Sequence, residues 1–83
     1  MNQTEIKSAV VAALKSVAPE SDPASISEAA PLRDTLDLDS MDFLNFVIAL
    51  HAALQVDIPE ADYGKVRTLN DAVSYIERKL GTP

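Results

Sequence analysis

The chain has 83 residues, with seven Lys or Arg against thirteen Asp or Glu and a formal net charge of −6. A chain this short predicts a single domain over residues 1–83 with a core of modest size. Its negative field disfavours nucleic acid and anionic membranes as partners and favours proteins with basic surfaces.

The chain contains no cysteine, so neither disulfides nor a cysteine-based metal site can stabilise it. This composition is compatible with the reducing cytoplasm, where we expect the protein to reside. No run approaches the roughly 18 apolar residues of a membrane span, and residues 1–5 lack the basic start of a signal peptide. We therefore expect no membrane span. We also expect the protein to be a monomer.

The first predicted element is an amphipathic helix from Thr4 to Val17, with Thr4 as its N-cap and Pro19 beyond its end. Its apolar stripe recurs at helical spacing and comprises Ile6, Val10, Leu14 and Val17.

A long segment, Ala18–Asp39, follows and contains three of the five prolines. We expect it to be largely irregular, with a helical turn within Asp22–Ala29. A connection this long is uncommon in a compact domain unless it has a function. Its length would allow the next helix to run in the same sense as the first. Spaced apolar residues indicate that the segment is packed on the helices: Ile26, Leu32, Leu36 and Leu38.

The second long helix is predicted over Ser40–Leu54 and is apolar around most of its circumference. One face carries the core stripe, namely Phe43, Phe46, Val47, Leu50 and Leu54. The opposite side carries Met41, Asn45, Ile48 and Ala52, with Leu44 between the faces. Such a helix is either buried on all sides or has a second surface to cover. We favour a partner-facing surface, because so small a domain can hardly surround a helix.

Two further helices complete the prediction. A short helix spans Glu60–Lys65, and the last helix spans Leu69–Leu80, with Tyr75 on the flank of its apolar stripe. Thr68 and Asp71 resemble a capping box with Asp in place of Glu, and Gly81 is the expected terminator. The predicted fold class is all-α: a small four-helix bundle of three main helices and one short helix, with a long first loop.

Ser40 lies where the long segment meets the apolar helix. Either Asp39 or Ser40 could simply cap this helix, since both are favoured N-cap residues. The same position would also suit a phosphodiester on Ser40, because a helix N-terminus favours anions.

The pattern Leu36-x-x-Asp39-Ser40-Met41 at the start of an apolar helix, in a small acidic chain, resembles the modification site of acyl carrier proteins. The resemblance covers Ile6–Leu80. It implies that Ser40 carries a covalent 4'-phosphopantetheine arm, derived from coenzyme A, whose thiol holds an acyl group as a thioester. It also implies a carrier rather than an enzyme, with a phosphopantetheinyl transferase and acyl-transferring or acyl-processing enzymes as partners.

The resemblance also assigns roles to individual residues. Asp39 matches the acid that modifying enzymes recognise, and Met41 stands where Leu is usual. Phe46, Leu50 and Leu54 match core positions that can line an acyl-chain cavity. Partner contacts are expected from Met41, Asp42, Leu44, Asn45 and Ile48.

The chain departs from the family on the outer face of this helix. Carriers of fatty acid synthesis often have glutamates at the positions of Asn45, His51 and Ala52, whereas Asp42 is the only acid between Met41 and Leu54. This difference suggests a specialised carrier in lipid or other acyl metabolism that docks through a more apolar surface.

Three alternatives remain open: an aminoacyl or peptidyl carrier, an unmodified interaction module that uses the apolar face of residues 40–54, and a hydrolase that uses Ser40. The hydrolase is disfavoured, since eleven residues of helix place His51 about 16 Å from Ser40. A calcium loop beginning at Asp37 fails, because Asp42 and Ile48 occupy its glycine and glutamate positions. The sequence predicts no catalytic residue and no metal site.

Overall fold

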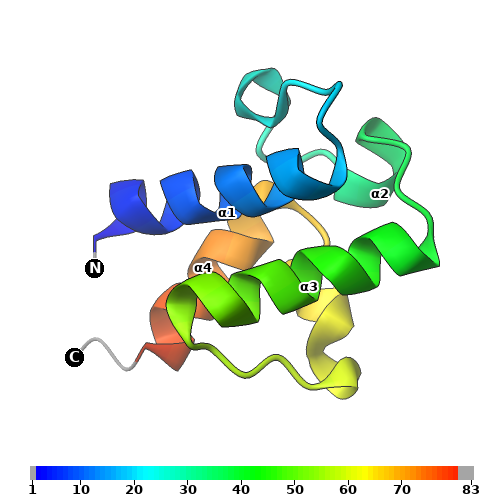
Figure 1. The fold of residues 1–83 in the computed structure, drawn as a ribbon. Coiled ribbons are helices and arrows are strands. Elements are labelled where there is room, and N and C mark those ends of the chain that lie inside the picture. The colour runs from blue at the N-terminus through cyan, green and yellow to red at the C-terminus, as the bar shows by residue number, and fades with distance from the viewer. Residues whose placement is uncertain (1, 81–83) are drawn as a thin grey trace.

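The computed structural model describes residues 2–80, and the regular structure in this part of the chain is helical (Figure 1). The elements are α1 Gln3–Val17, the 3-10 turn η1 Pro23–Ser25, α2 Leu32–Thr35, α3 Ser40–Leu54, the 3-10 helix η2 Glu60–Val66 and α4 Leu69–Lys79. The only β pairing in residues 2–80 is an isolated bridge between Pro31 and Thr68. The all-α prediction is confirmed, with three long helices and a short one over the range expected for it.

Helix α1 begins one residue earlier than the sequence predicted, because Asn2 and not Thr4 is its N-cap. The Asn2 side chain accepts the Glu5 N–H at 2.8 Å, and the Glu5 carboxylate accepts the Asn2 N–H at 3.2 Å. This reciprocal capping box satisfies two backbone donors at once. The assignment of the cap to Thr4 was therefore wrong.

The core lies where α1 packs against both α3 and α4. Its side chains are buried, and the long helices contribute Ile6, Val10, Ala13, Leu14, Phe43, Phe46, Val47, Leu50, Leu54, Leu69, Ala72, Tyr75 and Ile76. The predicted core stripe of α3 is buried throughout. Val17 and Leu80, at helix ends, are only partly buried.

Figure 1 shows that α3 runs back in the opposite sense to α1. The length of the first connection would also have allowed the same sense, but the chain does not adopt it. The residues of this connection form η1, α2 and the turns around them. They lie near the C-terminal end of α1, which is also where α3 begins.

The segment between α1 and α3 contains the short helix α2, which the sequence did not predict. Leu32 is completely buried, and Leu36 and Leu38 are 8% and 6% exposed. The Leu32 N–H donates to the Arg67 carbonyl at 2.8 Å, which fixes α2 to the residues before α4. Buried apolar side chains therefore hold this segment on the helices, as expected.

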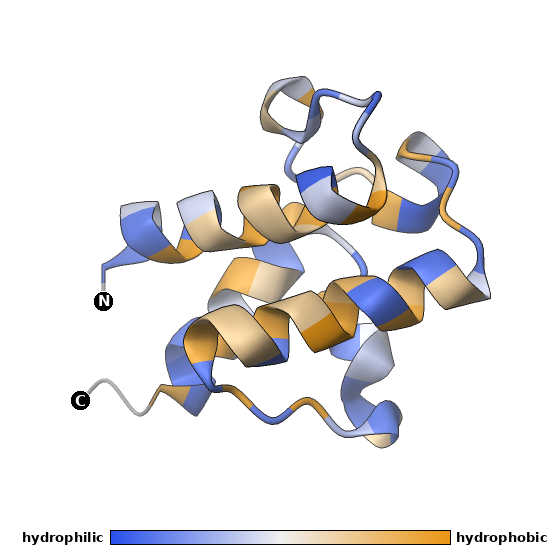
Figure 2. Cartoon of the chain, viewed as in Figure 1, coloured by the Kyte–Doolittle hydropathy of each residue, from blue (hydrophilic) through white to orange (hydrophobic). Residues whose placement is uncertain are grey.

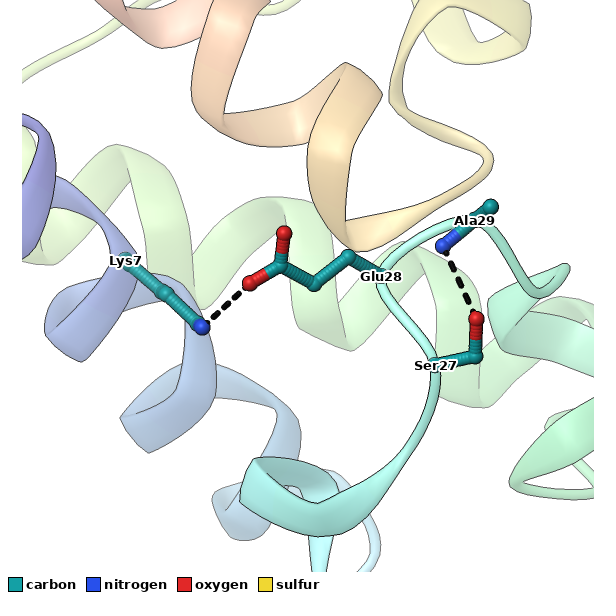
Figure 3. Close-up of polar contacts among 4 residues, drawn as sticks. All are labelled: Lys7, Ser27, Glu28 and Ala29. Carbon is teal, nitrogen blue, oxygen red and sulfur yellow. Dashed lines mark hydrogen bonds and ion pairs between the residues drawn. The ribbon is translucent and has the colours of Figure 1, made fainter.

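The earlier part of the segment is fixed by polar contacts. Glu28 forms an ion pair with Lys7 of α1, and the Ala29 N–H donates to the Ser27 hydroxyl at 3.3 Å (Figure 3). The Asn70 N–H donates to the Glu28 carbonyl at 3.0 Å. These contacts attach the segment to both α1 and α4.

Tyr75 is buried at 4% exposure, although the helical pattern placed it on the flank of the last helix. Its hydroxyl donates to Asp62 of η2 at 2.6 Å, so the buried phenol has a polar partner. Burial, together with this hydrogen bond to a carboxylate, raises the pKa of Tyr75 to about 12. The Tyr75 hydrogen bond lowers the pKa of Asp62 in turn. The interaction fixes η2 to α4.

Helix α4 begins as the sequence predicted, since the Thr68 hydroxyl accepts the Asp71 N–H at 3.0 Å. The reciprocal bond of a full capping box is absent among the hydrogen bonds of residues 2–80. The predicted terminator Gly81 lies outside the described residues.

Burial on α3 predicts two different responses to truncation. Leu50 is 0% exposed, so Leu50→Ala should lower the free energy of unfolding by about 2–5 kcal/mol. Ile48 is 54% exposed, so Ile48→Ala should change it by less than about 1 kcal/mol. Urea denaturation of both variants is the measurement. Equal losses would contradict the burial pattern.

Candidate functional site

Ser40 is the first residue of α3, and its neighbour Asp39 is the N-cap. The Asp39 carboxylate accepts the Asp42 N–H at 2.8 Å, and the Asp42 carboxylate accepts the Asp39 N–H at 3.3 Å. The cap is thus formed by Asp39 and not by Ser40, which settles the choice that the sequence left open. The Ser40 hydroxyl lies exposed at the helix start and takes no part in capping.

The chain approaches Ser40 through a tight, well-anchored turn. Asp37 adopts a left-handed conformation with φ 55°, which Asp tolerates better than most residues. Next to it, Leu38 is buried, and its N–H donates to the Arg33 carbonyl at 2.8 Å. The turn therefore fixes the position of Ser40 relative to α2.

Arg33 of α2 is the side chain that contacts Ser40, and the sequence analysis did not identify it. Its Nη2 lies 3.4 Å from the Ser40 Oγ, and its Nε donates to the Leu38 carbonyl at 3.4 Å. Its guanidinium carbon lies 6.0 Å from the centre of the Phe43 ring. These three contacts place a cation beside the exposed hydroxyl. The sequence offered one indication of this role, since Arg33 is the only Lys or Arg in a long acidic stretch of the chain.

Arg33 also lines an open cavity of about 640 Å³. Its lining combines apolar, acidic and basic side chains with one glycine, namely Pro31, Arg33, Asp34, Asp37, Leu38, Phe43, Tyr63, Gly64 and Arg67. The Phe43 and Tyr63 rings meet edge to face with centres 5.8 Å apart. Volumes in this range are typical of small-molecule pockets.

The outer face of α3 exposes the apolar residues expected there. Met41, Leu44 and Ile48 are 64%, 37% and 54% exposed, and they are the exposed large hydrophobic residues of the described chain. Figure 2 shows hydrophobic residues along much of this helix, and the exposed fractions of three of them contradict the alternative of a helix buried on all sides. That alternative was wrong.

The polar residues of the expected partner face have different surroundings. Asn45 is exposed, as are His51 and Ala52. Asp42 is half-buried, because its carboxylate takes part in the cap of α3. Asp42 therefore has a structural role beside any contact with a partner.

The three residues expected to line an acyl-chain cavity are buried in the core. Phe46 and Leu50 are 0% exposed, and Leu54 is 8% exposed. None of them lines the cavity beside Arg33. Their role in holding an acyl chain stays a prediction.

The arrangement around Ser40 is not that of a catalytic serine. His51 lies eleven residues along α3, and its Nδ1 lies 3.0 Å from the Val56 carbonyl oxygen.

Among residues 2–80, no three His, Cys, Asp or Glu side chains are grouped to hold a metal ion. Within the same residues, no helix has the length and hydropathy needed to cross a membrane.

Comparison with known proteins gives a consistent result. A family model described as a phosphopantetheine attachment site matches residues 8–76. The chain is 40% identical to the acyl carrier protein of Thermotoga maritima over 60 residues, which cover 72% of this chain and 74% of the relative. It is 37% identical to the acyl carrier protein of Lactobacillus acidophilus over 75% of this chain and 78% of the relative. It is 34% identical to that of Bdellovibrio bacteriovorus over 70% of this chain and 74% of the relative.

The cap of α3 predicts different outcomes for two substitutions at Asp39. Asp39→Ala removes the side-chain acceptor of the Asp42 N–H and should lower the free energy of unfolding by about 0.5–2 kcal/mol. Asp39→Asn retains an acceptor of similar capping strength and should stay within about 0.5 kcal/mol of the parent protein. Chemical denaturation measures both. An equal loss in the two variants would show that the charge, and not the cap, stabilises the helix.

Proposed function

The chain belongs to the acyl carrier protein family and carries a 4'-phosphopantetheine arm, and from this premise we propose that Ser40 is the residue to which the arm is attached. The observation that supports Ser40 most strongly is the division of roles at the start of α3. Asp39 caps the helix and leaves the neighbouring hydroxyl exposed. No other serine follows an aspartate at the start of a described α-helix.

The surroundings of Ser40 fit a phosphodiester. The N–H groups of Ser40 and Met41 belong to the first turn of α3, where backbone donors have no acceptor within the helix. Together with the positive end of the helix dipole, such donors favour an anion. The Arg33 guanidinium adds a positive charge that contacts the Ser40 Oγ.

The cavity beside Arg33 gives the remainder of the arm a surface on which to lie. Its rings, Phe43 and Tyr63, offer apolar contact, and its charged side chains offer hydrogen-bond partners for amides. When bound, the arm supplies a thiol that holds an acyl group as a thioester. Residues 1–83 then act as one carrier domain.

We propose that the protein carries cargo and does not catalyse a reaction itself. The side-chain partner of Ser40 in the described structure is Arg33, whose guanidinium has N–H donors and no acceptor for the proton of the hydroxyl. As a carrier, the protein interacts with a modifying transferase and with acyl-processing enzymes. We further propose that it works as a cytoplasmic monomer.

The cargo proposed is an acyl group of lipid or other specialised acyl metabolism. The relatives matched over more than two thirds of their length are named acyl carrier proteins, which favours acyl over aminoacyl or peptidyl cargo. An unmodified interaction module is disfavoured, because the matched family model is that of an attachment site. The partners are proposed to contact Met41, Leu44 and Ile48, with Asn45 and Asp42 at the side of this apolar surface.

Replacement of Ser40 tests the attachment site. Ser40→Ala should abolish loading by a broad-specificity phosphopantetheinyl transferase with coenzyme A, because the variant lacks the acceptor hydroxyl. Intact mass measures loading, and circular dichroism should show an unchanged helical fold. Ser8→Ala, at an exposed serine of α1, is the matched control and should load fully. Any loading of Ser40→Ala would refute the assignment.

The exposed apolar surface of α3 predicts how the loaded carrier meets its partners. Met41→Ala and Ile48→Ala should each lower kcat/KM of an acyl-transferring enzyme about 3- to 10-fold, a loss of roughly 1 kcal/mol. Because apolar contacts are weakly screened, this loss should persist at high salt. Val11→Ala on α1 is the control. Normal kinetics of both α3 variants, with activity abolished by salt alone, would exclude apolar docking.

A further inference from the structure

The middle of the chain is strongly acidic and contains a single strong base. Between Lys15 and Lys65 there are ten Asp or Glu residues and one Lys or Arg, which is Arg33. The fold places this cation against the Ser40 Oγ, at 3.4 Å.

Arg33 does not use its charge in an ion pair. The ion pairs among residues 2–80 are Lys7–Glu28 and Lys65–Asp62, although Asp34 and Asp37 lie close to Arg33 in sequence. The contacts of Arg33 are instead with electrically neutral groups: a carbonyl, a hydroxyl and an aromatic ring. Its guanidinium is thus held in position while its charge has no anionic partner in the described part of the chain.

The attachment of a phosphodiester changes the charge balance at this point. The carboxylates of Asp39 and Asp42 already lie on either side of Ser40 in the capping box. A phosphodiester would add a third negative charge, and like charges at close range repel. A guanidinium is well suited to offset this charge, because its planar N–H groups match pairs of phosphate oxygens.

We propose that Arg33 binds the phosphodiester carried by Ser40 and so directs the start of the arm toward the cavity that Arg33 lines with Phe43 and Tyr63. The inference rests on the proposed attachment at Ser40. Arg33 lies on α2, which Leu32 anchors in the core, so the cation is held by the fold and is not part of α3 itself.

A purely structural role for Arg33 makes a different prediction. Its Nε donates to the Leu38 carbonyl and could simply stabilise the turn before α3. A contact of that kind would stabilise the unloaded and loaded proteins equally. Binding of the phosphodiester stabilises only the loaded protein, so the change in stability on loading separates the two roles.

The experiment compares unloaded and loaded forms of the parent protein, Arg33→Gln and Arg78→Gln. Arg78 is an exposed arginine in the last turn of α4 and controls for the loss of one positive charge. Coexpression with the transferase loads each protein, and intact mass verifies completeness. At low ionic strength, loading should raise the Tm of the parent and of Arg78→Gln by about 1–5 °C more than that of Arg33→Gln. This difference should shrink as salt is added.

Nuclear magnetic resonance gives a second readout that is independent of stability. In the parent protein, the Arg33 Nε–H resonance should move on loading. The ³¹P line of the arm should be narrower in Arg33→Gln than in the parent, because the phosphodiester is then less restrained.

The outcomes separate failure of this proposal from failure of the proposed function. If the parent protein does not load at Ser40, the proposed function fails. If it loads, but the three proteins gain equal stability and the Arg33 resonance does not move, only the role of Arg33 is overturned. Failure of Arg33→Gln to load at all would also overturn the proposal. Arg33 would then be needed for the transfer of the arm to Ser40.

Discussion

The reciprocal hydrogen bonds between Asp39 and Asp42 determine where α3 begins, and the position of Ser40 depends on them. In a short helical domain, the unpaired N–H groups of a helix start need acceptors. Here two flanking carboxylates provide them, so the serine between them is released from capping. Ser40, the proposed attachment residue, is therefore exposed, and hydrogen bonds of the residues on either side of it hold its backbone in place.

The long segment between α1 and α3 provides α2, whose Arg33 contacts Ser40. Leu32, Leu36 and Leu38 bury their side chains against the helices, and this burial positions α2 beside the start of α3. The burial of one such side chain contributes roughly 1.5–3 kcal/mol, whereas a single exposed ion pair contributes at most about 1 kcal/mol. Burial of apolar side chains therefore holds the segment on the helices. The polar contacts of Glu28 and Arg33 add smaller contributions that fix the local conformation of the segment.

The three long helices could be predicted from the sequence because their apolar residues recur at helical spacing over three or more turns. The same periodicity identified the exposed residues Met41 and Ile48. It could not identify α2, which has only four residues and is held by tertiary contacts. Tyr75 was placed on a flank because the pattern of one helix does not reveal that η2 covers this side. The contact between Arg33 and Ser40 depends on a left-handed turn at Asp37, which local sequence specifies only weakly.

The central claim is that the arm is attached to Ser40, and peptide-level mass spectrometry of the loaded parent protein tests it most directly. Cleavage after Arg33 and Lys65 releases residues 34–65, in which Ser40 is the only serine. Fragmentation of this peptide should locate the phosphopantetheine on Ser40 and leave every other tryptic peptide unmodified. Phosphopantetheine on a peptide that contains Ser8, Ser16 or Ser74, or its absence from residues 34–65, would contradict the claim.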